Sequence, residues 1–411
     1  MPRAVRLLIA LIAVGACVSV IWCTSRVALS RVMARYAIKV GSIGAANQAV
    51  TYANSDAEAH LLSASLLKAS GALSESIPEF EQAAALRPRD YYHWLELGMA
   101  RDENEDQPGA LAAFNESVRF APFYGQPLWQ RGNLLLRMGR YDEGFRDLRA
   151  AVASNPDFTP AFIDLCFNIS RADSKLTEEL VQPTTPAIHM AFAKYLAQHN
   201  KPTEALEHLK LAGTISEEDR KEIIAVLISN KAFAEAFQIW NKSDRTSEDR
   251  VYDGGFEGPL SIGETGFAWR IRREIKGINL SHATNAQSGT RSLQIEFAGE
   301  SDPAVPIVSQ LIIVQPNTKY QISFAAQTKE IVSGGLPYAT VTDAIEDGRR
   351  LGQSIPFSNT TTSWQPAVFQ FTTGYRTTAV ILNFERQPCS SQPCPAFGTL
   401  WLDSIGIQAV K

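Results

Sequence analysis

The chain has 411 residues, of which 45% are hydrophobic and 20% are charged, and its formal net charge is −4. This length exceeds what one hydrophobic core usually organises, so it predicts two or three domains. The slightly negative charge excludes the strong positive field that nucleic-acid binding needs, and we expect no nucleic-acid partner.

An apolar segment near the N-terminus, residues 4–23, carries a single charge close to its start. About 17–25 apolar residues suffice to cross the hydrocarbon core as a helix, and Trp22 falls at the far end, where tryptophan favours the membrane interface. We predict a retained transmembrane signal anchor over 4–23, followed by a juxtamembrane helical segment over 24–54. Two alternatives stay open: a cleaved secretory peptide, or a lipoprotein lipidated at Cys17, because Val14-Gly15-Ala16-Cys17 resembles a bacterial lipoprotein box.

Charge and cysteine patterns disagree about the side of the membrane on which the body lies. Arg3 and Arg6 come before the uncharged stretch that begins at Leu7, and four basic residues follow the segment, at positions 26, 31, 35 and 39, which favours a cytoplasmic body. Cys389 and Cys394 bracket a short loop without a neighbouring histidine or further cysteine, so we expect a disulfide rather than zinc, with two free thiols as the alternative. Because disulfides persist in oxidising compartments, we predict a single-pass membrane protein with its body on the periplasmic or extracellular side.

Three prolines recur every 34 residues, at positions 88, 122 and 156. The residue 24 positions before each proline is small and the residue eight positions before it is large and apolar; the pairs are Ala64 and Phe80, Gly98 and Phe114, and Gly132 and Leu148. Such a period is typical of stacked helix pairs. Small residues let two antiparallel helices approach, large ones fill the space beside them, and proline ends the second helix. We predict a helical array over 55–240 that becomes irregular after Pro156.

The best-formed repeat has Trp94, Leu97 and Gly98 in its first helix, and Ala110 and Phe114 in its second, before the closing proline. This pattern resembles the tetratricopeptide repeat. The resemblance implies an α-solenoid that binds a protein partner on a concave face formed by the first helices. Side chains expected on that face, each with an ordinary solvated surface position as the alternative, are Tyr91, His93, Arg101, Gln126, Gln130 and Arg137. The histidines of the array are scattered singly, with no pair at metal-ligand spacing.

After Arg250 the helical period gives way to short stretches in which apolar and polar residues alternate. Turn residues such as Ser288-Gly289 and Asp347-Gly348 separate these stretches. Seven or more short strands in about 160 residues indicate an antiparallel β-sandwich over 251–411. The polar segment 241–250 is the predicted linker.

The order of signals in this region resembles the jelly-roll carbohydrate-binding modules of the galactose-binding-like superfamily. The residues that carry the resemblance are Asp253-Gly-Gly-Phe-Glu257, Phe267-Ala-Trp269, Ser288 to Leu293, Gln310, Pro316 to Tyr320, Trp364 and Leu400 to Asp403. The resemblance implies that aromatic rings stack on sugar rings. The candidates are Trp269, Tyr338, Phe357, Trp364 and Tyr375, although sandwich cores also use aromatic residues and most of these are expected there.

The same resemblance implies a structural calcium ion near the place where the first and last strands meet. Glu257 and Asp403 would supply its carboxylates, with carbonyl oxygens completing the shell. The alternative is that both carboxylates accept hydrogen bonds from backbone N–H groups and that no ion binds.

No catalytic signature stands out in the sequence. It contains no Gly-x-Ser-x-Gly elbow, no Walker loop and no His-Glu-x-x-His motif. Glu296 and Glu300 could hydrolyse glycosides only if the fold placed two carboxylates across a cleft, and acidic residues near turns are common. We therefore predict that the protein is not an enzyme.

The order of anchor, array and sandwich favours a membrane-anchored binding scaffold. Its repeats would bind a protein partner, and its sandwich would bind a glycan or another envelope component. One alternative is an assembly factor for a cell-envelope or polysaccharide-export machine in which the sandwich is only structural. The other alternative is a glycan-active enzyme.

Overall fold

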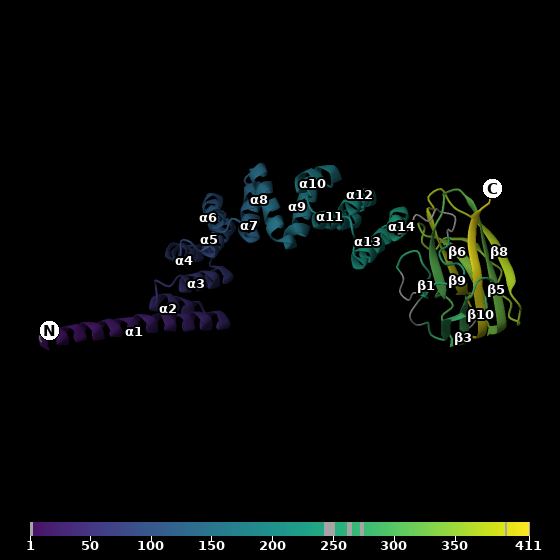
Figure 1. The fold of residues 1–411 in the computed structure, drawn as a ribbon, viewed down its shortest axis with the longest axis horizontal. Coiled ribbons are helices and arrows are strands. Elements are labelled where there is room, and N and C mark those ends of the chain that lie inside the picture. The colour runs from purple at the N-terminus through teal and green to yellow at the C-terminus, as the bar shows by residue number, and fades with distance from the viewer. Residues whose placement is uncertain (1–2, 242–250, 261–264, 272–274, 391–392, 411) are drawn as a thin grey trace. The chain divides into compact units, whose positions relative to one another are not determined.

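The computed structural model describes residues 3–241, 251–260, 265–271, 275–390 and 393–410. Within this part of the chain, helices come first and strands follow (Figure 1). Contacts divide the chain into two compact units, Met1–Gln182 and Pro183–Lys411. Residues 242–250 of the predicted linker lie outside the described residues.

The first unit consists of consecutive antiparallel helices. They are α1 (Arg3–Val40), α2 (Ile43–Tyr52), α3 (Ala57–Ala69), α4 (Leu73–Leu86), α5 (Tyr91–Glu103), α6 (Gln107–Phe120), α7 (Gly125–Arg137), α8 (Tyr141–Ser154), the short 3₁₀ helix η1 (Pro156–Phe158), α9 (Thr159–Ile169) and α10 (Ser174–Val181). The second unit begins with α11 (Pro186–Gln198), α12 (Pro202–Ala212), α13 (Glu217–Ser229) and α14 (Phe233–Trp240). The predicted helical array is thus confirmed.

The 34-residue repeat has a steric cause at the contact between the two helices of each pair. A Cβ atom on Gly98 would lie 2.5 Å from the ring of Phe114, and one on Gly132 would lie 2.9 Å from Leu148. Phe114 and Leu148 have no exposed surface. The glycine therefore lets α5 approach α6, and α7 approach α8, closely enough to bury the large residue. Helix starts also recur at 34 residues, since Asp56 and Asp90 both accept a backbone N–H at a helix N-terminus.

Helix α1 is long enough and apolar enough to cross a membrane over part of its length, Ile9–Val40. Its apolar side chains are exposed, for example Leu11 at 67% and Trp22 at 65%. Its second half packs on α2: Ser30 Oγ donates to the carbonyl of Ala49 at 2.7 Å, and Arg26 Nε donates to that of Tyr52 at 2.9 Å. The apolar segment and the first hairpin of the array therefore share one continuous helix.

The strands form an antiparallel β-sandwich, as predicted. Their bounds are β1 (Arg270–Ile271), β2 (Ile278–Ala283), β3 (Ser292–Glu300), β4 (Val308–Ile313), β5 (Lys319–Ser333), β6 (Pro337–Asp343), β7 (Arg350–Gln353), β8 (Gln365–Thr372), β9 (Ala379–Arg386) and β10 (Pro395–Ala409). Among the described residues, one sheet, sheet A, has the order β1-β4-β9-β6-β7, and the other, sheet B, has the order β2-β3-β10-β5-β8.

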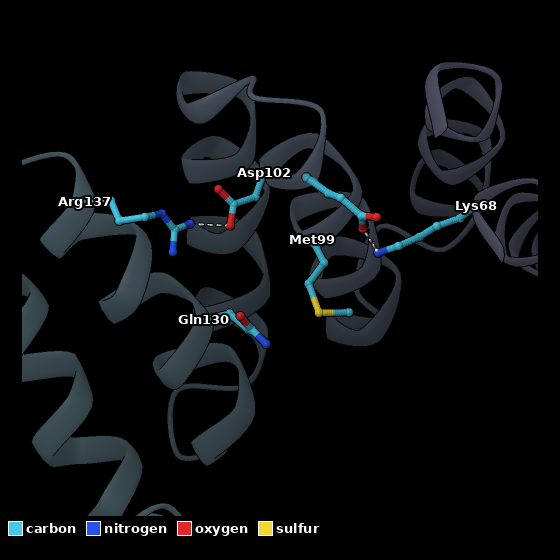
Figure 2. Close-up of a pocket in the computed structure, with 6 residues that line it drawn as sticks. Lys68, Met99, Asp102, Gln130 and Arg137 are labelled. Carbon is cyan, nitrogen blue, oxygen red and sulfur yellow. Dashed lines mark hydrogen bonds and ion pairs between the residues drawn. The ribbon is translucent and has the colours of Figure 1, made fainter. Parts of the chain in front are cut away.

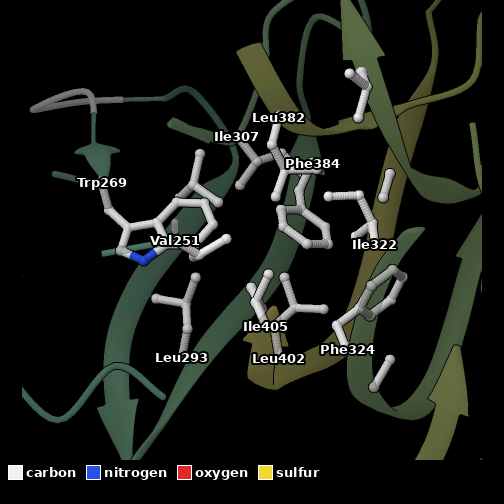
Figure 3. Packing of buried hydrophobic residues seen from close by; sticks show 14 of the residues in the cluster. Val251, Trp269, Leu293, Ile307, Ile322, Phe324, Leu382, Phe384, Leu402 and Ile405 are labelled. Carbon is white, nitrogen blue, oxygen red and sulfur yellow. The ribbon is translucent and has the colours of Figure 1, made fainter. Parts of the chain in front are cut away.

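The core of the sandwich lies between these two sheets. Phe384 and Leu382 of sheet A face Leu293 and Leu402 of sheet B (Figure 3). Alternate residues of each strand therefore point away from the core, and those outward positions form the two outer faces of the sandwich.

The Asp253 to Glu257 motif opens the sandwich at a close backbone crossing. The Ile405 N–H donates to the carbonyl of Gly254 at 2.8 Å, and a Cβ on Gly254 would lie 2.0 Å from the carbonyl oxygen of Ile405. Only glycine fits there without a backbone shift. Trp269 donates its indole N–H to the carbonyl of Asp253 at 2.9 Å, so this motif ties the start of the sandwich to its core.

Candidate functional site

A groove of about 410 Å³ opens on the helical array of the first unit (Figure 2). Its lining comes from the first helices of three successive hairpins, which are α3, α5 and α7. The residues are Lys68, Met99, Asp102, Glu103, Gln130 and Arg137. The sequence prediction placed the partner-binding face on these first helices, and that face stays a prediction.

Ion pairs bridge neighbouring hairpins at the groove. Lys68 Nζ lies 2.8 Å from a carboxylate oxygen of Glu103, and Arg137 pairs with Asp102 (Figure 2). The Glu103 and Arg137 side chains are about half exposed, at 55% and 49%. Exposed pairs of this kind stabilise a protein by about 0–1 kcal/mol, so charged groups of a ligand can replace them at small cost.

Two of the six predicted partner-binding side chains, Gln130 and Arg137, line this groove. Gln126 is exposed but lies outside the lining. Tyr91 stacks on Tyr124 with ring centroids 4.9 Å apart, so its ring contacts the next repeat. Arg101 donates to Glu81 at 2.6 Å and to the carbonyl of Gly109 at 3.1 Å, and these bonds connect adjacent helices.

His93 is buried, with 2% of its surface exposed. Its Nδ1 lies 3.2 Å from a carboxylate oxygen of Asp90, but neither ring nitrogen makes a hydrogen bond to a residue that the structure describes. Burial lowers the pKa of His93 more than the nearby Asp90 carboxylate raises it. The residue is therefore neutral at pH 7 and cannot reach a partner on the surface.

Four residues of the lining were not expected from the sequence: Lys68, Met99, Asp102 and Glu103. The pairs Lys68–Glu103 and Asp102–Arg137 each join residues 35 positions apart, close to the repeat period. Opposite charges one period apart on successive first helices were therefore the available signal.

Two histidines that looked isolated in the sequence lie together. His189 on α11 and His208 on α12 approach to 3.0 Å between their Nδ1 atoms, and His208 is buried. No group of three or more metal-binding side chains occurs among the described residues.

The outer face of sheet A carries a polar cluster, and sequence alternation explains why. Ala339, Val341, Leu382 and Phe384 face the core, so their neighbours on β6 and β9 face outward. These neighbours are Tyr338, Thr340, Thr342, Asn383 and Glu385, with Arg350 on the adjacent β7.

Hydrogen bonds and a ring contact join this cluster. Glu385 Oε1 accepts from Arg350 Nη2 and from Thr340 Oγ1, both at 3.1 Å. The Arg350 guanidinium lies over the Tyr338 ring, 5.5 Å from its centroid. Burial, and then the Glu385 charge, raise the pKa of Tyr338, so its hydroxyl stays protonated. Tyr338, Thr340 and Asn383 of this cluster are buried, whereas Glu385 is partly exposed and Arg350 is exposed.

The other aromatic candidates occupy three different environments. Trp269 and Phe357 belong to the core, with 4% and 7% of their surfaces exposed, and Trp269 stacks on Phe256. Their rings are therefore used in packing. Tyr375 is 68% exposed in the loop after β8, with Arg376 over its ring. Trp364 is half-buried just before β8, on the sheet B side.

Glu257 and Asp403 lie near each other, since both approach the position that a Cβ on Gly255 would occupy, at 3.8 and 3.7 Å. Glu257 Oε1 accepts from the backbone N–H groups of Thr290 and Arg291, at 2.7 and 3.0 Å, and the Thr290 hydroxyl donates to its Oε2. These donors lower the pKa of Glu257.

Asp403 Oδ2 accepts from the N–H groups of Gln287 and Ser288, at 2.7 and 3.0 Å, and its Oδ1 accepts from that of Ser404. Both carboxylates therefore accept hydrogen bonds from backbone N–H groups, as the alternative to calcium binding expects. The calcium ion stays a prediction.

The carboxylates considered for catalysis lie apart. Glu296 and Glu300 are four residues apart on β3, which is roughly 13 Å along an extended strand. Glycosidases hold their carboxyl groups about 5–9.5 Å apart. Glu300 pairs with Lys276 at 2.7 Å, and Glu296 accepts from Asn279 at 3.4 Å.

The structure joins Cys389 and Cys394 by a disulfide, with Cα atoms 6.0 Å apart. The buried Arg386 supports this loop. It donates to the carbonyls of Cys394 at 2.9 Å and Ser301 at 3.1 Å, and to Ser333 Oγ at 2.7 Å.

Comparison with protein families matches residues 61–124 to the tetratricopeptide repeat and residues 248–391 to a carbohydrate binding domain. Comparison with curated proteins gives no match.

Several solved structures are similar to parts of the chain. MamA from Desulfovibrio magneticus RS-1 is 14% identical over 46% of this chain and 93% of its own, with a TM-score of 0.31. A structure titled "CBM4 structure and function" is 17% identical over 39% of this chain and 99% of its own, with a TM-score of 0.30. YrrB, titled a TPR protein with an unusual peptide-binding site, is 15% identical over 48% of this chain and 89% of its own, with a TM-score of 0.27. Likeness at this level says nothing about ligands. From the two family matches, the chain is a protein with tetratricopeptide repeats and a C-terminal carbohydrate-binding-module-like domain.

Proposed function

We propose that this chain is a non-enzymatic, membrane-anchored binding scaffold. Its helical repeats bind a protein partner, and its β-sandwich binds a glycan or another component of the cell envelope. The observation that carries the proposal is the groove on α3, α5 and α7, whose charged side chains form ion pairs that are exposed at Glu103 and Arg137 and partly buried at Lys68 and Asp102.

The groove suits an extended peptide that carries charges of both signs. Its anionic and cationic groups would replace the partners in the Lys68–Glu103 and Asp102–Arg137 pairs. Met99 supplies an apolar and adaptable contact in the same lining, and the Gln130 amide can bind the peptide backbone.

A peptide array probed with the detergent-solubilised full chain tests the groove. Replacing Met99→Asp or Arg137→Ala should weaken binding of captured peptides by about tenfold, the effect of losing 1.4 kcal/mol. Gln126→Ala is the matched control, because Gln126 is exposed on α7 outside the lining and its loss should change nothing. Equal affinities for all four proteins would show that the groove is not the peptide site.

The polar cluster on sheet A is the proposed glycan site for the sandwich. Arg350, whose side chain is 47% exposed, covers the Tyr338 ring, so its movement would open the ring to a sugar. Arg350→Ala and Glu385→Gln should both weaken the retardation of the full chain in polysaccharide gels, because each removes a polar group of the proposed site. If the sandwich binds no polysaccharide while the groove binds peptide, the assembly-factor alternative replaces the glycan half of the proposal.

The apolar half of α1 supports membrane anchoring, and the Cys389–Cys394 disulfide supports a body outside the cytoplasm. The expected result is that the full chain resists alkaline extraction from membranes and that a reporter fused at Lys411 is active only outside the cytoplasm. A chain released by alkaline extraction, or a reporter active in the cytoplasm, would contradict this localisation.

A further inference from the structure

The outer face of sheet B carries a row of uncharged side chains that the sheet A site does not include. Strand register places Ser281, Gln294, Trp401 and Gln327 opposite one another on β2, β3, β10 and β5. Leu293, Ile295, Leu400 and Leu402, their neighbours in sequence, face the core, so these four side chains point outward. Trp364 and Asn285 stand beside the row, because Asn285 bonds Gln327 and Trp364 bonds Asn285.

Two indole groups determine how the amides in this row are oriented. An indole N–H can only donate, so an amide bonded to it must offer its oxygen. Trp401 Nε1 donates to Gln294 Oε1 at 3.1 Å, and this turns the Gln294 NH2 group away from the indole.

The second indole acts through one further amide. Trp364 Nε1 donates to Asn285 Oδ1 at 3.4 Å, and Asn285 Nδ2 then donates to Gln327 Oε1 at 2.9 Å. The Gln327 NH2 group therefore points away from Asn285. As a result, two NH2 donors, from Gln294 and Gln327, flank the half-buried Trp401 ring on the adjacent strands.

We propose that this indole–amide row is a second glycan-binding surface, which takes a neutral polysaccharide. A sugar ring would stack on Trp401, and the two flanking NH2 groups would donate to its hydroxyl or ring oxygens. The row itself has no formal charge, and the exposed side chains that adjoin it on β3 and β5, Glu296 and Lys329, are opposite in sign, so the surface favours uncharged chains. That the ligand is a glycan rests on the proposed function, whereas the location of this surface rests on the strand register and the hydrogen bonds.

The surface is distinct from the sheet A site. The two lie on opposite sheets of the sandwich, and their accessibility differs. Tyr338 on sheet A is 3% exposed, whereas Gln294, Trp401 and Gln327 are all partly exposed and Ser281 is exposed. The sheet B row can therefore meet a polymer without rearrangement.

Native affinity electrophoresis of the full chain in detergent tests this proposal. The gels contain hydroxyethylcellulose, laminarin or galactomannan as neutral probes, and polygalacturonate as the acidic one. We expect retardation in at least one neutral gel and none in polygalacturonate. Trp401→Ala should abolish that retardation, and Gln294→Glu and Gln327→Glu should each weaken it by about threefold to tenfold, since each removes one donor while keeping the side-chain shape.

Phe397→Ala is the matched control, because Phe397 lies on the same strand and face, is 49% exposed, and stands outside the row. The two glutamine variants keep the proposal testable if Trp401→Ala fails to fold. Retardation that survives the row variants but is lost in Arg350→Ala would overturn the second surface and leave the proposed function intact. Equal losses in Phe397→Ala and the row variants would also overturn it. No retardation of the wild-type chain in any gel would overturn both this surface and the glycan half of the proposed function.

Discussion

Gly98 lies so close to the Phe114 ring that no larger side chain fits without a shift of α5 or α6. Gly98→Ala should therefore lower the free energy of unfolding by about 1–3 kcal/mol, the usual cost of overpacking a core. Gly44→Ala is the control, because Gly44 is exposed in α2 and the same exchange there should stabilise by up to about 1 kcal/mol. Urea unfolding followed by circular dichroism measures both. A stabilising Gly98→Ala would contradict the packing account of the repeat.

The buried His93 should make stability depend on pH. In the unfolded chain it binds a proton near its ordinary pKa of about 6.5, whereas in the folded chain burial lowers its pKa. As pH falls below about 6.5, the unfolded state gains protons first, so the folded state loses stability until the folded pKa is reached. His93→Leu should reduce this loss in thermal unfolding between about pH 5 and 7. An unchanged pH profile would show that His93 is protonated without cost in the folded state.

Arg386 is buried, is held by carbonyl and hydroxyl oxygens, and has no carboxylate partner among the described residues; burial lowers its pKa. Arg386→Lys keeps the charge but cannot reach the separate groups that the guanidinium joins. Both Arg386→Lys and Arg386→Ala should lower the thermal midpoint of the sandwich. Full stability of the lysine variant would mean that charge alone is needed.

At the scale of secondary-structure elements, two carboxylates connect loops to the ends of strands. Asp403→Asn removes an acceptor from the Gln287 and Ser288 N–H groups and should destabilise the sandwich by about 1–3 kcal/mol. Because both carboxylates already accept hydrogen bonds from backbone N–H groups, we expect that neither calcium nor EDTA shifts the thermal midpoint of the wild-type chain. A calcium-dependent rise in the midpoint would restore the calcium site that the sequence resemblance implied.

The helical array could be predicted from sequence because its determinants are local. Gly98 and Phe114 are 16 residues apart and recur with the period, so the steric rule is visible in the chain itself. The sandwich was predictable for the same reason, since alternation and turn residues are also local signals.

The sites were harder to predict because they depend on tertiary neighbours. Trp269 and Tyr338 were equal candidates for sugar binding in the sequence. In the structure, Trp269 packs in the core and Tyr338 joins the polar cluster on sheet A. Trp401 is not among the aromatic residues that the sequence suggested for sugar binding, because only the register between strands places it beside Gln294 and Gln327. Likewise, His189 and His208 meet only through the pairing of α11 and α12.

At the scale of the whole molecule, α1 joins its apolar half to the first hairpin of the array without a break. Arg26 and Ser30 hold α2 against the same helix. Should α1 span a membrane, the first repeats would lie next to the surface and move with the anchor. Replacing Ser30→Ala and Arg26→Ala together should raise hydrogen exchange in α2 while leaving membrane extraction unchanged. Unchanged exchange would show that these bonds do not hold the hairpin.

The central claim is that this protein binds without catalysing a reaction. The most direct measurement incubates the solubilised full chain with fluorescent laminarin, galactomannan and hydroxyethylcellulose, and follows both retention on the protein and polymer length by size-exclusion chromatography. The account predicts retention of at least one neutral polymer with its length unchanged. Shortening of a polymer, abolished by a single carboxylate substitution, would contradict it.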